Sequence, residues 1–352
     1  MSGKRALTWK HPVTLSLAYR FVINAASPSH ELVTGEYTEH KKADIYWGGR
    51  LYTNVPIISG NAVRRYVKEA LRDIAVSKGL PLGGLCRRGI FTHWNTSRDM
   101  KEDVGTSDDF LEGLRKCVME DVSGFMLAEG NRSVIRFSRL HVSMVKPVYE
   151  DLENASVYHI QFARHDVRRG AKGEAGEKLS GQQPFRVEHV SGRFAGVITL
   201  DAHLIGYDDI GYGGSEPKGY FISKKKVIER AEAVVKAISD GVYRRFGSMK
   251  ARSLTVIAQD TAVLAVVKGV YTPPDPSLEG SSEKYVELVK KDLKAYTDLM
   301  GVDAHLIVVG GGCAGGSEGR VNISCFDTVP DAFQKAAEVV REYLKSAIPD
   351  EE

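Results

Sequence analysis

Positively charged side chains recur one helical turn apart in one segment of the chain. They are Arg64, Lys68 and Arg72, with Arg65 beside them. Ser59 precedes them and suits an N-cap, because its hydroxyl can accept a hydrogen bond from a free backbone N–H of the first turn. Such a helix start, with its positive dipole end, favours an anion. Together with Asn61, these residues predict binding to a phosphate backbone, although a solvated amphipathic helix would show the same pattern.

An apolar stripe beside these cations predicts the helix itself. Its members recur at helical spacing and are Val63, Val67, Ala70, Leu71 and Ile74. Gly79 suits the end of the helix, since glycine adopts the left-handed conformation at no steric cost. Earlier in the chain, large apolar residues alternate over residues 13–24 and predict a strand. The chain therefore begins with a strand, a long polar loop, a short strand near residues 49–55 and the basic helix.

The polar loop and the strand before it supply further candidates for phosphate contact. They are Asn24, His40, Lys41 and Lys42. An imidazole can act as an acid or a base on a phosphodiester, so His40 or His30 could also serve a nuclease that needs no metal. His40 could equally contact a phosphate, or only solvent.

A glycine-rich segment at residues 166–183 predicts a mobile loop. It holds four glycines and almost no apolar side chains, so it cannot pack a core. Strands are expected on both sides, at 157–166 and 184–204, which would place the loop at the tip of a long hairpin. Its candidate phosphate contacts are Arg164, His165, Arg168, Arg169 and Lys172. A surface excursion without a role would have the same composition.

A second glycine-rich turn lies at residues 310–319. Its backbone N–H groups could approach a phosphate, but it lacks the Lys-Ser/Thr pair of a P-loop. Gly315 to Gly319 match the G-x-S-x-G pattern around Ser317. A nucleophile elbow requires a helix after the serine, whereas residues 320–326 predict a strand. A hairpin turn without a ligand is the alternative.

The cysteines do not predict a metal site. They stand at positions 86, 117, 313 and 325, and no two have C-x-x-C spacing. Cys86, His93 and Cys117 could together bind zinc, but structural zinc sites normally show closely paired ligands. Buried, reduced thiols in a cytoplasmic protein are therefore expected, with no metal and no cofactor.

Composition sets the limits of these interpretations. The 352 residues carry 48 Lys and Arg against 45 Asp and Glu, so nucleic-acid binding must come from local clustering of charge. The share of hydrophobic residues, 43%, allows a sizeable core. The first residues lack the apolar run of a signal peptide, and no long uncharged apolar stretch predicts a membrane span.

The second half of the chain predicts alternating strands and helices. Helices are expected at 223–247, 281–300 and 330–347, a pair of strands at 253–270, and strands at 305–310 and 320–326. The fold class predicted is α+β, a single core with insertions. The parts expected are a first core part at 1–79, a helical insertion at 80–130, a hairpin insertion at 131–204 and a second core part at 205–352.

The order of these elements resembles a known family. It is carried by the Ser59-Gly60-Asn61-x-x-Arg64-Arg65 helix start, by residues 117–126, by the Arg136-Phe137-Ser138-Arg139 strand and by the late glycine turn. The chain is similar to the DevR-type backbone subunits of CRISPR Cascade complexes, in the archaeal branch of the repeat-associated mysterious protein superfamily. The resemblance implies a modified RNA-recognition-motif (ferredoxin-like) core whose hairpin insertion is a thumb.

The resemblance also implies a function in antiviral defence. The chain would bind CRISPR RNA without catalysis, polymerise with copies of itself into a helical filament, and present the guide to a target DNA strand beside other Cascade subunits. Asn61, Arg64, Arg65 and Lys68 would contact phosphates, and the thumb at 165–183 would displace one base. The alternatives are an endoribonuclease of the same superfamily and a DNA-binding regulator.

Overall fold

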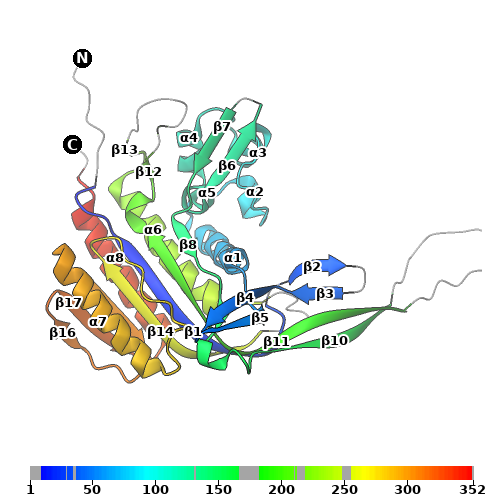
Figure 1. Cartoon of the computed structure of the whole chain (residues 1–352). Coiled ribbons are helices and arrows are strands. Elements are labelled where there is room, and N and C mark those ends of the chain that lie inside the picture. The colour runs from blue at the N-terminus through cyan, green and yellow to red at the C-terminus, as the bar shows by residue number, and fades with distance from the viewer. Residues whose placement is uncertain are drawn as a thin grey trace, which may run out of the picture.

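The chain folds as an α+β protein around one large mixed sheet, which confirms the predicted fold class (Figure 1). That its core is a modified RNA-recognition motif stays a prediction, as do the boundaries of the insertions. The computed structural model describes residues 9–28, 30–34, 37–130, 132–165, 182–209, 211, 219–247 and 255–350. The thumb residues Arg168, Arg169 and Lys172 lie outside this part of the chain.

The first strand of the chain lies inside the large sheet. It pairs antiparallel with β11 on one side and with β14 on the other. The main path of the sheet is β16 (Gly316–Glu318), β17 (Val321–Phe326), β15 (Ala304–Val309), β14 (Ile257–Val267), β1 (Thr14–Ala26), β11 (Gln182–Asp201), β3 (Tyr37–His40) and β2 (His30–Thr34). Three more strands pair with β11, namely β8 (Leu140–Val142), β9 (Lys146–Pro147) and β10 (Ser156–His165).

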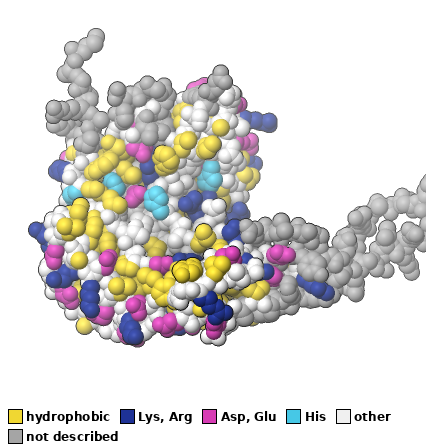
Figure 2. Space-filling view, viewed as in Figure 1, with side chains coloured by type: hydrophobic (Ala, Val, Ile, Leu, Met, Phe, Trp, Pro, Cys, Tyr) yellow, Lys and Arg dark blue, Asp and Glu magenta, His cyan; other side chains and the backbone are white. Residues whose placement is uncertain are grey.

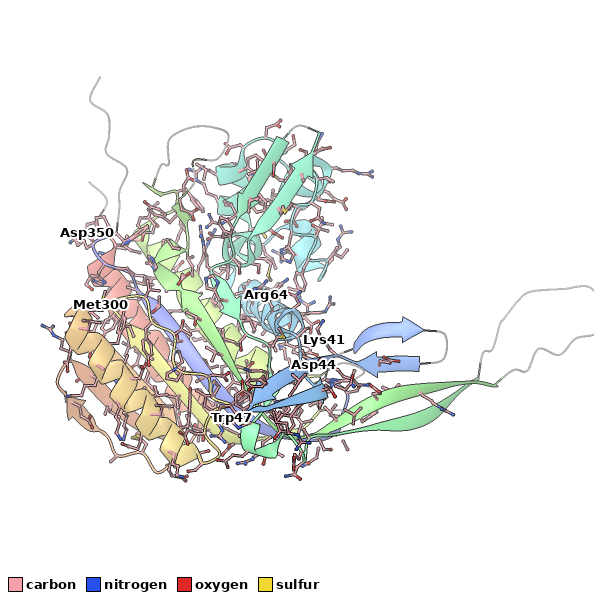
Figure 3. The ribbon with its side chains drawn as sticks, viewed as in Figure 1. Lys41, Asp44, Trp47, Arg64, Met300 and Asp350 are labelled. Atoms are coloured by element: carbon pink, nitrogen blue, oxygen red, sulfur yellow. A yellow bond between two sulfur atoms is a disulfide. The ribbon has the colours of Figure 1, made fainter. Side chains whose placement is uncertain are left out.

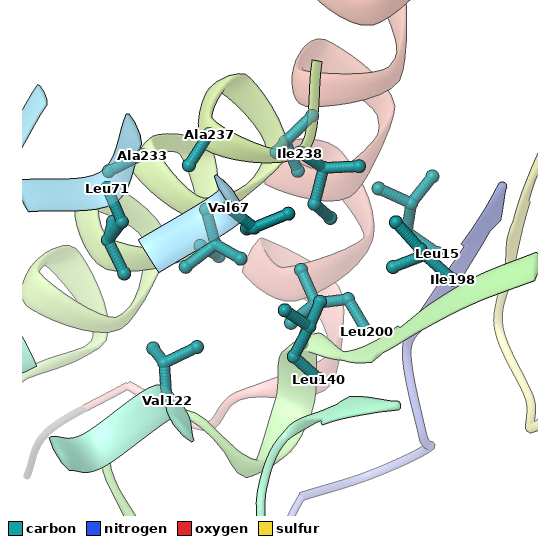
Figure 4. Packing of buried hydrophobic residues seen from close by; sticks show 14 of the residues in the cluster. Leu15, Val67, Leu71, Val122, Leu140, Ile198, Leu200, Ala233, Ala237 and Ile238 are labelled. Carbon is teal, nitrogen blue, oxygen red and sulfur yellow. The ribbon is translucent and has the colours of Figure 1, made fainter. Parts of the chain in front are cut away.

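Long helices cover both faces of the sheet. On one face, β1 packs through Leu15, Leu17 and Phe21 into a core that α6 and α8 share, with α1 against α6 (Figure 4). On the other face, Ala18 and the strand β14 pack against α7 through Tyr285. These helices are α1 (Gly60–Lys78), α6 (Lys224–Tyr243), α7 (Ser282–Met300) and α8 (Val329–Ala347). Their predicted positions are confirmed to within a few residues.

A compact group of short elements lies beyond α1. It contains α2 (Gly84–Arg87), α3 (Ser97–Val104), α4 (Phe110–Lys116), α5 (Val118–Ser123) and the hairpin of β6 (Phe125–Glu129) with β7 (Arg132–Arg136). Asp121 of this group is fully buried between the guanidinium groups of Arg136 and Arg230, the second of which belongs to α6. This ion cluster therefore ties the group to the core of the molecule.

The predicted polar loop between the first strand and the basic helix is wrong. Residues 30–34 and 37–40 form β2 and β3, and the next residues form a hairpin of β4 (Lys42–Trp47) with β5 (Arg50–Pro56). β3, the strand before the last one of the sheet path, pairs with β11 at Tyr37 opposite Arg186. Backbone pairing with a distant strand creates these strands, and their polar side chains hide the alternation that would predict them.

The predicted pair of strands at 253–270 is also wrong, since one strand, β14, spans the polar residues Gln259 and Asp260. The register with β1 shifts there, because Arg20 lies opposite Thr261 and Phe21 opposite Gln259. Asp260 is thus the extra residue of a β-bulge, and its carboxylate lies 3.2 Å from the Arg20 guanidinium. Polar residues that interrupt an apolar run mark a turn or a bulge equally well, so the sequence alone does not distinguish the two.

The cysteines divide into two pairs. Cys86 and Cys117 are buried and free, as expected, whereas Cys313 and Cys325 form a disulfide and correct the prediction of four reduced thiols. The pairing follows from the fold, because the glycine turn after β15 leads back to β17, which lies parallel to β15. Ser317 lies in β16 and is followed by strand β17, as predicted, so the context of a nucleophile elbow is absent here.

Candidate nucleic-acid interface

The start of α1 is built as the sequence predicts. Ser59 has extended backbone angles and its hydroxyl accepts a hydrogen bond from the Ala62 N–H. The first turn carries no acidic side chain, so nothing within it offsets the positive end of the helix dipole. Gly60 lies against the end of β8, since an added Cβ would come within 2.6 Å of the Val142 carbonyl oxygen. Glycine therefore allows the backbone of another segment to approach the helix start.

Arg64 is the cation one turn into α1. Its side chain is half-buried, and its Nη2 donates to the Leu140 carbonyl oxygen at 3.3 Å. Its Nε is buried and has no hydrogen-bond acceptor, and no carboxylate of the described residues forms a salt bridge with it. Burial lowers the pKa of this guanidinium from its usual value. Arg64 is therefore a half-buried cation without a carboxylate partner among the described residues.

Lys68 follows Arg64 by one turn. Its Nζ lies 2.6 Å from Nε2 of His93 and 5.8 Å from the centre of the Phe91 ring. Burial, and then the nearby Arg64 charge, lower the pKa of Lys68 to about 8. That Phe91 and His93 border this cation could not be predicted from the sequence, because α1 and the segment after α2 meet only in the folded chain.

Two other predicted residues of α1 are exposed. The Asn61 side chain is open to solvent at the first turn. Arg65 forms an ion pair with Glu69 one turn on, with 63% of its side chain exposed. An exposed pair of this kind contributes about 0–1 kcal/mol, so the Arg65 guanidinium can exchange its partner for a phosphate at little cost.

The structure brings the predicted group around Lys41 to the same helix start. The Lys41 carbonyl oxygen accepts a hydrogen bond from Ile57 N–H at 2.9 Å, two residues before the N-cap, and Figure 3 shows Lys41 and Arg64 on neighbouring elements. Lys42 pairs with Glu188 at 2.8 Å. The His40 side chain is only 2% exposed, with Nδ1 beside the Lys41 carbonyl oxygen. His40 therefore offers little surface to a ligand.

The remaining predicted contacts lie on β1 and on the long hairpin. Asn24 is exposed near the end of β1, and the hydroxyl of Tyr66 in α1 donates to Pro28, just after that strand. Arg164 and His165 are the last two residues of β10, and the structure describes their backbone but not their side chains. The β10–β11 hairpin projects from the body beside β2 and β3 (Figure 1), and side chains of both charges lie near its base (Figure 2).

The molecule is thus an α+β protein with a row of cations along the start of a long helix and with a projecting hairpin. A family model described as "CRISPR-associated negative auto-regulator DevR/Csa2" matches residues 17–290. The match covers more than half of the chain, and the chain belongs to this family. The resemblance stated from the sequence is confirmed.

Individual relatives agree with this assignment. The chain is 29% identical over 251 residues to a "CRISPR-associated aCascade subunit Cas7/Csa2 2" of Saccharolobus solfataricus, covering 68% of this chain and 75% of the relative. It is 20% identical over 301 residues to a "CRISPR-associated protein Cas7/Csa2 1" of the same organism, covering 82% and 89%.

A solved structure shares the fold. A chain of a "CRISPR RNA-guided surveillance complex, pre-nicking" superposes with a TM-score of 0.53 at 11% identity, covering 93% of this chain and 99% of that one. Among the described residues, every helix is too short or too polar to cross a membrane.

Proposed function

We propose that this chain is a CRISPR RNA-binding backbone subunit of a Cascade-type interference complex. Membership of the DevR/Csa2 family and the relative named as an aCascade subunit support this proposal. Within that complex the chain would pack beside further copies of itself and other Cascade subunits. Its role would be to hold the guide RNA, with no chemical step of its own.

The start of α1 carries the proposal. Arg64 and Lys68 lie one turn apart without a carboxylate partner among the described residues, next to free N–H groups of the first turn. Consecutive RNA phosphates are negative charges joined along a chain, and such a row of donors and cations suits them. A compact anion would leave the second cation unused.

Contacts of this type are tolerant of sequence. Phosphate contacts fix the position of a nucleic acid, whereas base edges carry its sequence information. A subunit that holds only the backbone leaves the base edges open for pairing with a target DNA strand. The projecting β10–β11 hairpin gives each copy a means to reach its neighbour, which supports assembly along the RNA (Figure 1).

The salt dependence of RNA binding tests the proposal. Each phosphate contact on a single strand contributes about −0.7 to the slope of log K against log salt concentration. Replacing Arg64 by Gln should flatten this slope by about 0.7 and weaken all RNA sequences alike. Fluorescence anisotropy with two unrelated oligonucleotides measures both effects.

A matched variant gives the control. Lys291 is an exposed cation on α7, which packs on the other face of the sheet, and Lys291→Gln should leave the slope unchanged. An unaltered slope in Arg64→Gln would remove this helix start from the interface. Tighter binding to duplex DNA than to RNA would instead favour the DNA-binding regulator.

A further inference from the structure

A cluster of thiols and carboxylates lies inside the group of short helices. Ligand atoms of Cys86, Asp103 and Cys117 all lie within 4.8 Å of one another, and all three side chains are buried. Cys86 belongs to α2 and Asp103 to α3, while Cys117 is the residue before α5. Three elements therefore direct one potential ligand each to a single point.

We propose that this cluster is a structural zinc site. Zn²⁺ binds thiolates at about 2.3 Å and carboxylate oxygens at about 2.0–2.2 Å in a tetrahedral arrangement. In that geometry neighbouring ligand atoms are about 3.3–3.8 Å apart, so the three side chains need to move inward by only a small distance to bind one ion. Thiolates select a soft or borderline metal over Mg²⁺ or Ca²⁺, which prefer oxygen ligands only.

Glu120 lies outside that group of three and would supply the fourth ligand once its side chain moves toward the ion. Its Oε1 lies 3.4 Å from Sγ of Cys86, and its side chain is fully buried in α5. Two thiolates and two carboxylates would then surround the ion with no open position. Because no place remains for water or substrate, the site would stabilise the fold rather than catalyse a reaction.

Hydrogen bonds already orient both carboxylates. Asp103 Oδ1 accepts from the backbone N–H groups of Leu85 and Cys86 at 2.7 and 3.1 Å, and its Oδ2 accepts from Trp94 Nε1 at 3.0 Å. Glu120 Oε2 lies 3.3 Å from Nδ1 of His93. Partners of this kind fix the direction of ligands and are typical of metal sites.

A glycine makes room for one of these carboxylates. A Cβ added at Gly83 would come within 2.1 Å of Asp103 Oδ2, so a larger residue there would displace the ligand. Burying carboxylates is costly unless a positive charge offsets them. Among the described residues, no Lys or Arg forms a salt bridge with Asp103 or Glu120, and a divalent cation would supply that charge.

The metal would stabilise elements that are too short to be stable alone. α2 has 4 residues, α3 has 8 and α5 has 6, and isolated helices of this length do not persist in water. One ion that joins all three would make the free energy of metal binding part of the folding free energy. His93 connects this site to the basic helix, because its ring lies between Glu120 and the ammonium group of Lys68.

Metal analysis and cobalt substitution test the proposal on the whole chain. Protein purified without chelator should contain about one zinc per chain by mass spectrometry, as a closed four-ligand site requires. Cobalt-loaded protein should show the thiolate-to-metal charge-transfer band and the intense visible bands of tetrahedral Co²⁺. The bound zinc and these cobalt bands should be lost in Cys117→Ser and retained in the matched double variant Cys313→Ser/Cys325→Ser.

A second variant covers the case in which Cys117→Ser does not fold. Glu120→Gln keeps the shape of the side chain and should weaken zinc binding by roughly tenfold or more in a competition titration. Folded wild-type protein that binds neither zinc nor cobalt through thiolates would overturn the proposal. Zinc that binds equally well to Glu120→Gln and Cys117→Ser would overturn it too, because the metal would then lie elsewhere.

Discussion

At the scale of single residues, two effects lower the pKa of Lys68, namely burial and a neighbouring positive charge. Desolvation disfavours its charged form, and the Arg64 guanidinium adds repulsion of like charge, so the pKa falls to about 8. An unfolded lysine titrates near 10.4. The ammonium is therefore held close to the point at which it loses its proton, and a bound phosphate would favour the charged form again.

A pH dependence of RNA binding follows from this pKa. Lys68 is mostly charged at about pH 7 and mostly neutral at about pH 9, so RNA affinity should fall as pH rises through about 8. Lys68→Arg should remove most of that fall, because a guanidinium stays charged throughout. Anisotropy titrations at constant ionic strength measure it. An identical fall in both proteins would show that another group is responsible.

The same shift has the opposite sign for stability. Between about pH 8 and 10.5 the unfolded chain holds the Lys68 proton and the folded chain does not, so stability from this group rises with pH. Affinity and stability should therefore move in opposite directions over this range. That contrast separates loss of a phosphate contact from general unfolding at high pH.

At the scale of elements, the approach of α1 to α6 positions the basic surface. Gly241 in α6 permits this approach, since an added Cβ would lie 2.7 Å from Cα and 2.8 Å from N of Val67. Both atoms are backbone and cannot rotate away. The cations of α1 thus depend on a glycine in a helix far along the chain.

Gly241→Ala should destabilise the protein. Alanine gains about 1 kcal/mol of helix propensity over glycine, whereas overpacking against a backbone costs about 1–3 kcal/mol, so packing decides the sign. We expect a lower midpoint in urea unfolding. Gly84→Ala is the control, because its Cβ meets nothing closer than 3.7 Å. A midpoint for Gly241→Ala at or above the wild type would show that the helices separate without cost.

At the scale of the whole molecule, the chain is expected to hold RNA without cutting it. His40, the histidine singled out for acid–base chemistry, is buried beside a backbone carbonyl. We therefore expect no specific cleavage of labelled repeat RNA, with or without magnesium, in a gel assay. Cleavage that disappears in His40→Ala would establish the endoribonuclease instead. His30 would be tested in the same way.

The sequence alone determined the local elements. Ser59, the apolar stripe through Leu71 and Gly79 define α1 by capping and by 3.6-residue periodicity, which act within a few turns. The alternation around Leu17 likewise defined β1. The family could be identified because its short motifs are continuous in the chain. The helix, the strand and the family motifs depend on residues that are neighbours in the sequence, so no contact with a distant segment is needed to predict them.

Tertiary structure decided what depends on contacts between distant segments. The strands from His30 to Trp47 exist because they pair with β11 and with each other, and the disulfide because a parallel strand brings Cys325 to Cys313. The cluster of Cys86, Asp103 and Cys117 is likewise spread over 32 positions that only folding unites. Burial then set which side chains a ligand can reach, since His40 is buried while Arg64 is only half-buried and has no carboxylate partner among the described residues.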